Sequence, residues 1–387
     1  METIIFTTAG AVLLLLVAYD VYATVLHSTA RYGPVGEGLN RAVWRVARKA
    51  AFGLSRRRRH KLLNAVGPAL MPLLIVTYIV LLTVAFALLY APHLPDSFIT
   101  AAGTKSDSVW LNAFYFSGCT LTTLGYGDIV PRTGGLRFVA LFEAASGFAL
   151  ISLAITYLLT VNTALERKRT VALSLYHQAG EGADAAGYIA HHFVDGRFYG
   201  LRDALRTSTR DIQALLESHV EHPVINYFHP VEVYRSLPRI LFLLLETCSV
   251  IRTSLDREES ADLRNFPEVR TLEASARYVL TQLVESLELE RRMRPRKAVG
   301  SEGEDDELRW RRRFEQTLAR LEASGIKARD DKKTAWEEYR AQREEWESRL
   351  ERLSLYLGFD WEEVTGDRDL EEAALETDEG PRAFTLG

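Results

Sequence analysis

The sequence predicts an all-α membrane protein with three transmembrane helices, one short re-entrant helix and a helical C-terminal domain. Three long apolar runs lie before Glu166, at residues 3–25, 72–90 and 136–161. Most of the charge follows Glu166, in segments whose apolar residues recur at helical spacing. A chain of 387 residues has room for two or three domains.

The first apolar run predicts a retained membrane helix within residues 1–26. Roughly twenty apolar residues suffice to cross a hydrocarbon core. Glu2 is the only charge ahead of the run, so the basic start of a signal peptide is missing. Asp20 is costly in mid-bilayer. We therefore expect it near the inner headgroups, within reach of the basic segment that follows.

Residues 27–66 form a basic segment whose only acidic residue is Glu37. Short basic loops stay in the cytoplasm, which places the N-terminus outside. Apolar residues at helical spacing predict an amphipathic helix on the inner leaflet. The segment ends in a run that either only fixes topology or also binds anionic lipid. This run is Arg56, Arg57, Arg58 and Arg59, followed by His60 and Lys61.

The second and third runs complete one topology. Pro72 suits the first turn of a helix, where its missing N–H costs nothing, and Pro92 and Pro95 end that run. Charged residues at 166–169 stop the third run on the cytoplasmic side. The sequence therefore predicts a multi-pass protein of the cell membrane, the inner one in a bacterium, with a cytoplasmic C-terminal domain.

Between these runs, residues 110–122 are too short and too polar to span, which predicts a half-helix that enters and leaves on one side. Residues 123–127 would follow it as extended backbone. Non-helical backbone at membrane depth is tolerated only where it lines a cavity or is buried in protein. Gly125 and Gly127 supply the dihedrals that such a backbone needs.

The stretch Thr-Thr-Leu-Gly-Tyr-Gly-Asp at 122–128 follows an aromatic-rich half-helix between two apolar runs. In this arrangement, residues 67–169 resemble the pore domain of prokaryotic tetrameric potassium channels. The resemblance implies a re-entrant pore helix and a selectivity filter whose carbonyls replace the water shell of K⁺. The implied filter is Thr123, Leu124, Gly125, Tyr126 and Gly127, supported by Thr122 and by Asp128, which would bond to Trp110 or Tyr115.

The same resemblance implies a homotetramer and a gate on the third helix. Gly147 is either a hinge or a point of close helix packing, and both interpretations stay open. Ile151, Ile155 and Leu159 are candidates for an apolar constriction. Glu143 would pair with a pore-helix residue or serve function directly. Two departures from the family pattern are Leu124, where valine is usual, and Cys119, where some members carry a buried glutamate.

Residues 170–357 predict a helical cytoplasmic domain, followed by an acidic tail at 358–387. Amphipathic stretches cover 201–219, 240–251 and 267–287, and the third would end at 293–295. An acidic linker is expected at 301–307, then a helical hairpin at 308–357 broken near Ser324 and Gly325. The tail is expected to be flexible at its end.

Several function classes find no support in the sequence. Gly180 and Gly182 lack the preceding strand and the further glycine of a dinucleotide site. Cys119 and Cys248 offer neither a disulfide framework nor a metal spacing. No span carries the arginine repeat of a voltage sensor. Five histidines lack a ligand set, namely His191, His192, His219, His222 and His229.

These observations favour a potassium-selective channel subunit that conducts passively and is gated by an unidentified cytoplasmic signal. We expect no enzyme activity, no cofactor, no metal beyond the permeant K⁺ and no nucleic-acid partner. The alternatives are a non-selective cation channel and a membrane-anchored scaffold with a vestigial pore.

Overall fold

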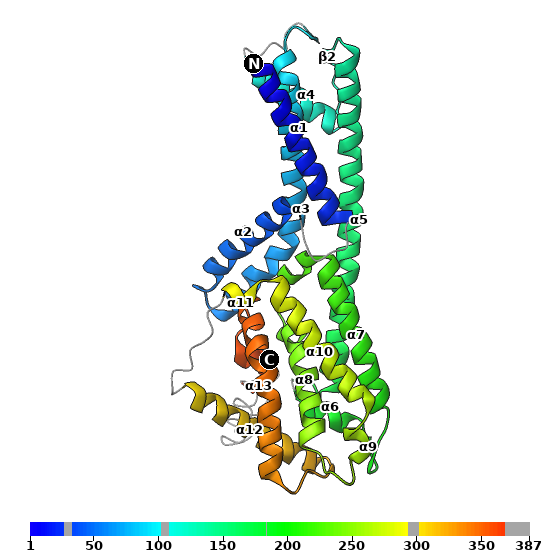
Figure 1. Cartoon of the computed structure of the whole chain (residues 1–387), viewed down its shortest axis with the longest axis vertical. Helices are drawn as coiled ribbons and strands as arrows, with labels where there is room; N and C mark the ends of the chain where they lie inside the picture. Colours follow the sequence, from blue (N-terminus) through cyan, green and yellow to red (C-terminus); the bar gives the residue numbers. More distant parts are fainter. Residues whose placement is uncertain (27–32, 102–107, 183, 293–301, 368–387) are drawn as a thin grey trace, which may run out of the picture. The chain divides into compact units, whose positions relative to one another are not determined.

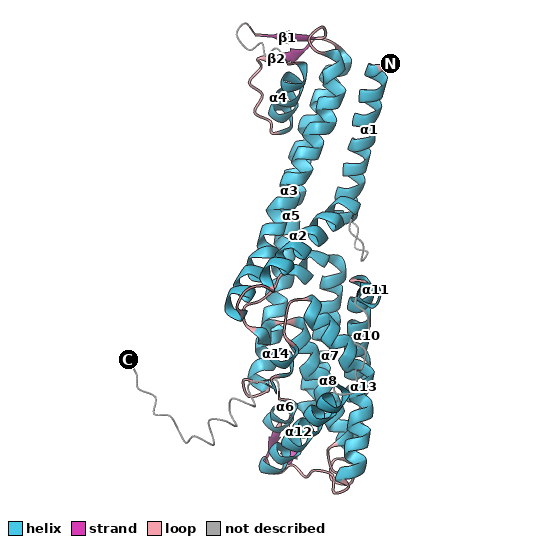
Figure 2. Cartoon of the chain, turned by 90° about the vertical axis from the view of Figure 1, so that its left-hand side faces the viewer, coloured by secondary structure: helices cyan, strands magenta, loops and turns pink. Residues whose placement is uncertain are grey.

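The structure is a computed structural model that describes residues 1–26, 33–101, 108–182, 184–292 and 302–367. The chain divides into two compact units. The first holds Met1–Thr163 with His219–Phe228, and the second holds Ala164–Ser218 with His229–Gly387. Helices dominate both (Figure 2), and the described strands form two small antiparallel sheets of two strands each. The predicted all-α class with three membrane helices is confirmed.

Three helices are long and apolar enough to cross a membrane, as predicted. They are α1 (Glu2–Val21), α3 (Arg56–Tyr90) and α5 (Gly134–Gln178). A short π-helical turn, Tyr22–Leu26, extends α1. In the first unit α1 packs along α3 (Figure 1).

One predicted helix start was wrong, and the third helix is longer than the predicted span. Helix α3 starts at Arg56, so Pro72 lies in its interior together with Pro68 rather than in the first turn. Proline keeps a helical φ and removes one N–H donor, and neighbouring groups in membrane bundles compensate for that loss. Helix α5 runs past the charged residues at 166–169. Charges at that position set a membrane boundary, but Glu, Lys and Arg are good helix formers.

The predicted amphipathic helix is α2 (Pro34–Ala51), and Asp20 caps its start. The buried carboxylate accepts hydrogen bonds from the amides of Val35 at 2.7 Å and Gly36 at 3.1 Å. The Tyr78 hydroxyl donates a third at 2.7 Å. Asp20 thus reaches the basic segment, but through free N–H groups at a helix start rather than arginines. It links α1, α2 and α3.

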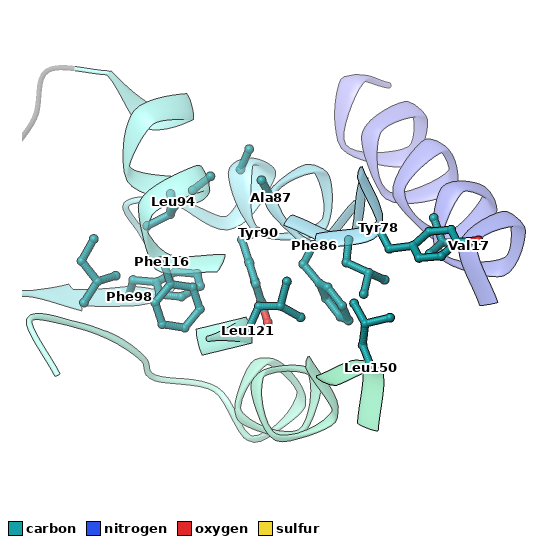
Figure 3. Close-up of a cluster of buried hydrophobic side chains, with 14 of the residues drawn as sticks. Val17, Tyr78, Phe86, Ala87, Tyr90, Leu94, Phe98, Phe116, Leu121 and Leu150 are labelled. Atoms are coloured by element: carbon teal, nitrogen blue, oxygen red, sulfur yellow. The ribbon is translucent and has the colours of Figure 1, made fainter. Parts of the chain in front are cut away.

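An aromatic cluster forms the core of the first unit beside the re-entrant helix α4 (Val109–Leu121). Tyr90 lies edge-on to Phe116 at 4.9 Å and to Phe98 at 5.9 Å between ring centroids (Figure 3). Phe98 begins β1 (Phe98–Thr100), which pairs antiparallel with β2 (Ile129–Pro131). Phe98 of the β1–β2 sheet and Tyr90 at the end of α3 therefore both pack against Phe116 of α4.

The second unit is built around α8 (Leu237–Thr253), which is buried along almost its whole length. Helices α6, α10 and α13 pack on it. The longer elements are α6 (Ala185–His191), α7 (Leu201–Glu221), α10 (Pro267–Ser286), α12 (Glu302–Ala323) and α13 (Lys332–Tyr356). Its short elements are β3 (Phe193–Val194), β4 (Arg197–Phe198), α9 (Ala261–Arg264), α11 (Leu289–Arg292) and α14 (Trp361–Thr365), with a 3₁₀ turn at Val233–Arg235. The first unit has 3₁₀ turns at Ala91–His93 and Pro223–Tyr227.

A buried charge network crosses the core of the second unit. Glu246 on α8 accepts from the Tyr339 hydroxyl at 2.5 Å and from Arg343 at 3.3 Å. Arg343 also donates to Glu347 at 2.6 Å, and its side chain is 1% exposed. The network fixes α13 against α8, because a charge buried without a partner is costly.

The predicted hairpin break is confirmed, because α12 ends at Ala323 and α13 begins at Lys332. The acidic linker was wrong, since α12 already begins at Glu302. Helix α14 lies at the start of the predicted acidic tail. Asp367, two residues after this helix, pairs with Arg313 at 2.5 Å, and this ion pair fixes the start of the tail to α12. Helix α10 ends at Ser286, and the end expected at 293–295 lies outside the described residues.

Candidate pore loop

The predicted half-helix is α4, and it is fixed at both ends. The Ser108 hydroxyl caps its start by accepting from the Leu111 amide at 3.3 Å. Trp110 lies edge-on to Phe6 of α1 at 5.0 Å between ring centroids. At the other end, the amide of Thr122 donates to the Gly118 carbonyl at 3.1 Å. The chain then leaves the helix.

The backbone after α4 alternates in handedness. Thr123, Gly125 and Gly127 have φ of 59°, 56° and 73°, while Leu124 and Tyr126 keep negative φ. In a regular strand successive carbonyls point to opposite sides, whereas alternation in the sign of φ turns successive peptide units the same way. Glycine takes the positive values without strain. Thr123 takes one at a cost typical of functional sites.

The carbonyl oxygens of residues 123–127 are left open. The amides of Thr123 and Leu124 turn back to the carbonyls of Thr120 at 3.0 Å and Cys119 at 2.9 Å. Across the described residues, nothing donates a hydrogen bond to the carbonyls of 123–127. All five residues are exposed in the single chain, with Tyr126 at 69%. The loop therefore presents a row of unused acceptors.

Asp128 braces the outer end of this loop. Its carboxylate accepts from the Tyr115 hydroxyl at 2.8 Å and from the Ile129 amide at 3.1 Å. Its carbonyl accepts from the Ala101 amide at 2.8 Å. Of the two partners expected for Asp128, the structure selects Tyr115. Hydrogen bonds thus join the end of the loop both to α4 and to the residue that follows β1.

Behind the loop, Glu143 joins three helices. The carboxylate is fully buried on α5 and accepts from Tyr90 of α3 at 2.8 Å. It also accepts from Ser117 of α4 at 2.5 Å. A pore-helix partner for Glu143 was predicted, and Ser117 is that partner. The part played by Tyr90 was missed, because a tyrosine at the end of an apolar run looks like an ordinary interface residue.

Gly147 is the point where α5 meets the end of α4. A methyl group added there would lie 1.9 Å from the Leu121 carbonyl oxygen. Close packing, one of the two interpretations, is therefore what the structure shows, and α5 is continuous through this position. A hinge at Gly147 stays a prediction. Further along α5, Ile151, Ile155 and Leu159 are each about half exposed or more in the single chain.

The four-arginine run divides into two parts. Arg59 turns inward, is 9% exposed and lies over the Phe52 ring at 5.4 Å. Arg56, Arg57 and Arg58 stay exposed at the start of α3. Lipid binding by the run stays a prediction, but only three guanidinium groups face outward.

The predicted histidines do not gather into a site. His222 lies edge-on to Tyr157 at 5.5 Å, and His229 stacks on Phe359 at 4.2 Å between ring centroids. His219 is buried. Within the part of the chain that the structure describes, no group of three or more His, Cys, Asp or Glu side chains is placed to hold a metal ion. These rings serve packing.

Comparison with known proteins points to the same region. Residues 73–164 match the family described as "Ion channel". The chain is 26% identical over 267 residues to the uncharacterized membrane protein YdjJ of Bacillus subtilis (strain 168). The aligned residues cover 69% of this chain and 75% of that protein. No solved structure matches. The three apolar helices place the chain in a membrane, and its residues 73–164 are similar to an ion channel module.

Proposed function

We propose that the chain is one subunit of a potassium-selective channel that conducts K⁺ passively. The observation that carries the proposal is the row of open carbonyls at 123–127 on a backbone of alternating handedness. Such oxygens stabilise a dehydrated cation by replacing its water shell. Because an unsatisfied backbone group is costly away from water, these carbonyls need a partner inside a membrane. A permeant K⁺ is that partner.

A single loop cannot surround an ion, so the proposal includes a homotetramer. In K⁺ filters of this type, four loops contribute one carbonyl each to every ring. The exposure of residues 122–127 in the single chain is what an interface with other copies requires. Helix α4 points its C-terminal, partly negative end toward the same region, which favours a cation.

Orientation and control complete the proposal. The second unit and the basic residues between α1 and α3 would lie on the cytoplasmic side, because short basic loops stay in the cytoplasm. Ile151, Ile155 and Leu159 on α5 would form the gate, and a signal sensed by the second unit would bias it. Anionic lipids would meet Arg56, Arg57 and Arg58 at the inner leaflet.

Flux from liposomes tests the proposal. Purified protein should release K⁺ faster than Na⁺ from otherwise identical vesicles. Gly125→Ala should abolish this preference, because an L residue at φ near +56° costs about 1–2 kcal/mol and displaces the carbonyl row. Gly38→Ala is the matched control, since Gly38 lies on α2 with open space around it.

Two results would overturn the proposal. Equal release of K⁺ and Na⁺ by the wild type would indicate a non-selective cation channel. No release of either ion across pH values and lipid compositions would indicate a scaffold with a vestigial pore.

A further inference from the structure

The second unit contains a cavity of about 690 Å³ whose lining is dominated by arginine. It lies where the end of α8, the segment after it, α9, the start of α10 and the first half of α13 meet. Its charged and amide side chains include Arg252, Arg257, Arg264, Arg270, Glu338 and Gln342. A cavity of this size is typical of small-molecule sites.

Carboxylates do not balance the arginines around this cavity. Arg252 pairs with Glu273. Glu338 pairs with two arginines, with Arg257 at 3.1 Å and with the buried Arg329 at 2.7 Å. Five arginines thus surround the cavity, four in its lining and Arg329 behind it. The carboxylates that act on them are Glu273, Glu338, Asp256 and Asp331, of which only Glu338 lies in the lining. Glu273 is shared in addition with Arg277 at 2.6 Å. The site carries an excess of positive charge.

Two of these arginines lack a carboxylate partner. Arg264 donates to the Arg252 carbonyl at 2.6 Å, and Arg270 has no hydrogen-bonding or ionic partner among the described residues. Burial, together with the charges of Arg257 and Arg329, lowers the pKa of Arg264. A guanidinium group whose pKa falls in this way lies in an electrostatically unfavourable position that an anion would relieve.

A neutral group points to the same conclusion. The Oε1 atom of Gln342, on the same wall as Glu338, is buried and accepts no hydrogen bond within the described part of the chain. Buried polar atoms in folded proteins normally have a partner. The lining therefore leaves one hydrogen-bond acceptor without a donor, and Arg264 and Arg270 without an anionic partner. This suits a ligand that carries both anionic groups and an N–H or O–H.

We propose that this cavity binds a soluble anion with two or more phosphate groups and the size of a nucleotide. Guanidinium groups form a planar fork that matches phosphate oxygens in pairs. One phosphate would leave most of the excess charge uncompensated, whereas a diphosphate or triphosphate would meet it. Binding would join α8, α9, α10 and α13 through one ligand. The proposal concerns only the second unit and does not depend on conduction by the first.

Isothermal titration calorimetry of the full-length protein in detergent tests this assignment. The probes are ATP and pyrophosphate, with inorganic phosphate as the single-phosphate comparison and dihexanoyl phosphatidylglycerol as the lipid comparison. ATP and pyrophosphate should bind more tightly than inorganic phosphate or the lipid, and added salt should weaken them. Arg264→Gln and Arg270→Gln should each weaken ATP about tenfold by removing a charge-assisted contact.

Arg349→Gln is the matched control, because Arg349 is an exposed arginine of α13 outside the cavity. It should leave ATP binding unchanged. Arg270 is exposed and unpartnered, so its variant should fold like the wild type, and the melting temperature without ligand checks this. Equal ATP affinity in wild type and Arg270→Gln, no heat from ATP or pyrophosphate, or binding of the lipid alone would each overturn the assignment. K⁺ flux measured separately would leave these outcomes unaffected.

Discussion

The pore loop and the core of the second unit differ in how their polar groups are hydrogen-bonded. In the core of the second unit, buried charged groups find partners within one chain: Glu246, Tyr339 and Arg343 are buried and bonded to one another. In the loop, the carbonyls of 123–127 stay open and exposed although both flanks of the loop are tied down. The contrast teaches that the loop's shape is set within one chain, whereas its oxygens find partners only outside it.

The largest effect on stability should come from breaking the buried charge network of the second unit. Arg343→Ala removes the cation that pairs with the buried Glu246 and leaves that carboxylate uncompensated, which should cost about 3–5 kcal/mol of unfolding free energy. Glu347 keeps its pair with Arg309 at 3.2 Å. Arg340→Ala, one turn away on α13 and 44% exposed, should cost at most about 1 kcal/mol. Chemical unfolding followed by circular dichroism measures both, and similar losses would contradict a buried network as the main link between α8 and α13.

The next effect concerns the support behind the loop. Gly147→Ala places a methyl group against the Leu121 carbonyl, so α5 and the end of α4 must move apart. Overpacking of this kind costs about 1–3 kcal/mol, and we expect K⁺ flux from liposomes to be lost. Gly38→Ala serves as the control at an open helical position. Normal flux from Gly147→Ala would show that the contact is not needed to hold the loop.

A smaller effect should follow at the start of α2. Asp20→Ala removes the cap from two amides and the partner of the Tyr78 hydroxyl, which should cost about 1–2 kcal/mol. Hydrogen exchange should then speed up in the first turn of α2 but not in α13. Tyr78→Phe keeps the cap and should leave exchange in that turn slow. If it speeds exchange as much as Asp20→Ala does, the cap is not what orders α2.

The smallest effect depends on pH. Burial opposes ionisation of Asp367, but the charge of Arg313 and hydrogen bonds from Thr365 and Arg313 outweigh it and hold the pKa of that carboxyl below its usual range. Stability from this pair should be complete above about pH 4, the ordinary carboxyl pKa, and lost as pH falls through the lower folded pKa. Asp367→Asn should therefore lower the melting temperature at neutral pH but not in strong acid.

Asp262→Asn controls for the loss of a carboxylate, since Asp262 is exposed on α9. It should change the melting temperature little at any pH. A gap between wild type and Asp367→Asn that stays constant down to strong acid would contradict a role for the charge of Asp367.

Sequence patterns predicted the three apolar helices, α2, the half-helix and the hairpin break, because each has a local signal in periodicity, charge or glycine. They failed at Pro72, which lies inside α3, and at residues 302–307, where the acidic run belongs to α12 because Glu is a good helix former. The bonds from Tyr115 to Asp128 and from Tyr90 to Glu143 could not be assigned from spacing, because they join separate elements. The arginine cavity was invisible for the same reason, since its arginines lie on different elements.

The open carbonyls of 123–127 need other copies of the chain to surround an ion, so the proposed channel depends on the oligomeric state. Native mass spectrometry of the full-length protein in a mild detergent, in K⁺, measures that state. We expect a complex of four times the mass of one chain. A preparation that conducts K⁺ after reconstitution but contains only single chains or pairs would contradict it.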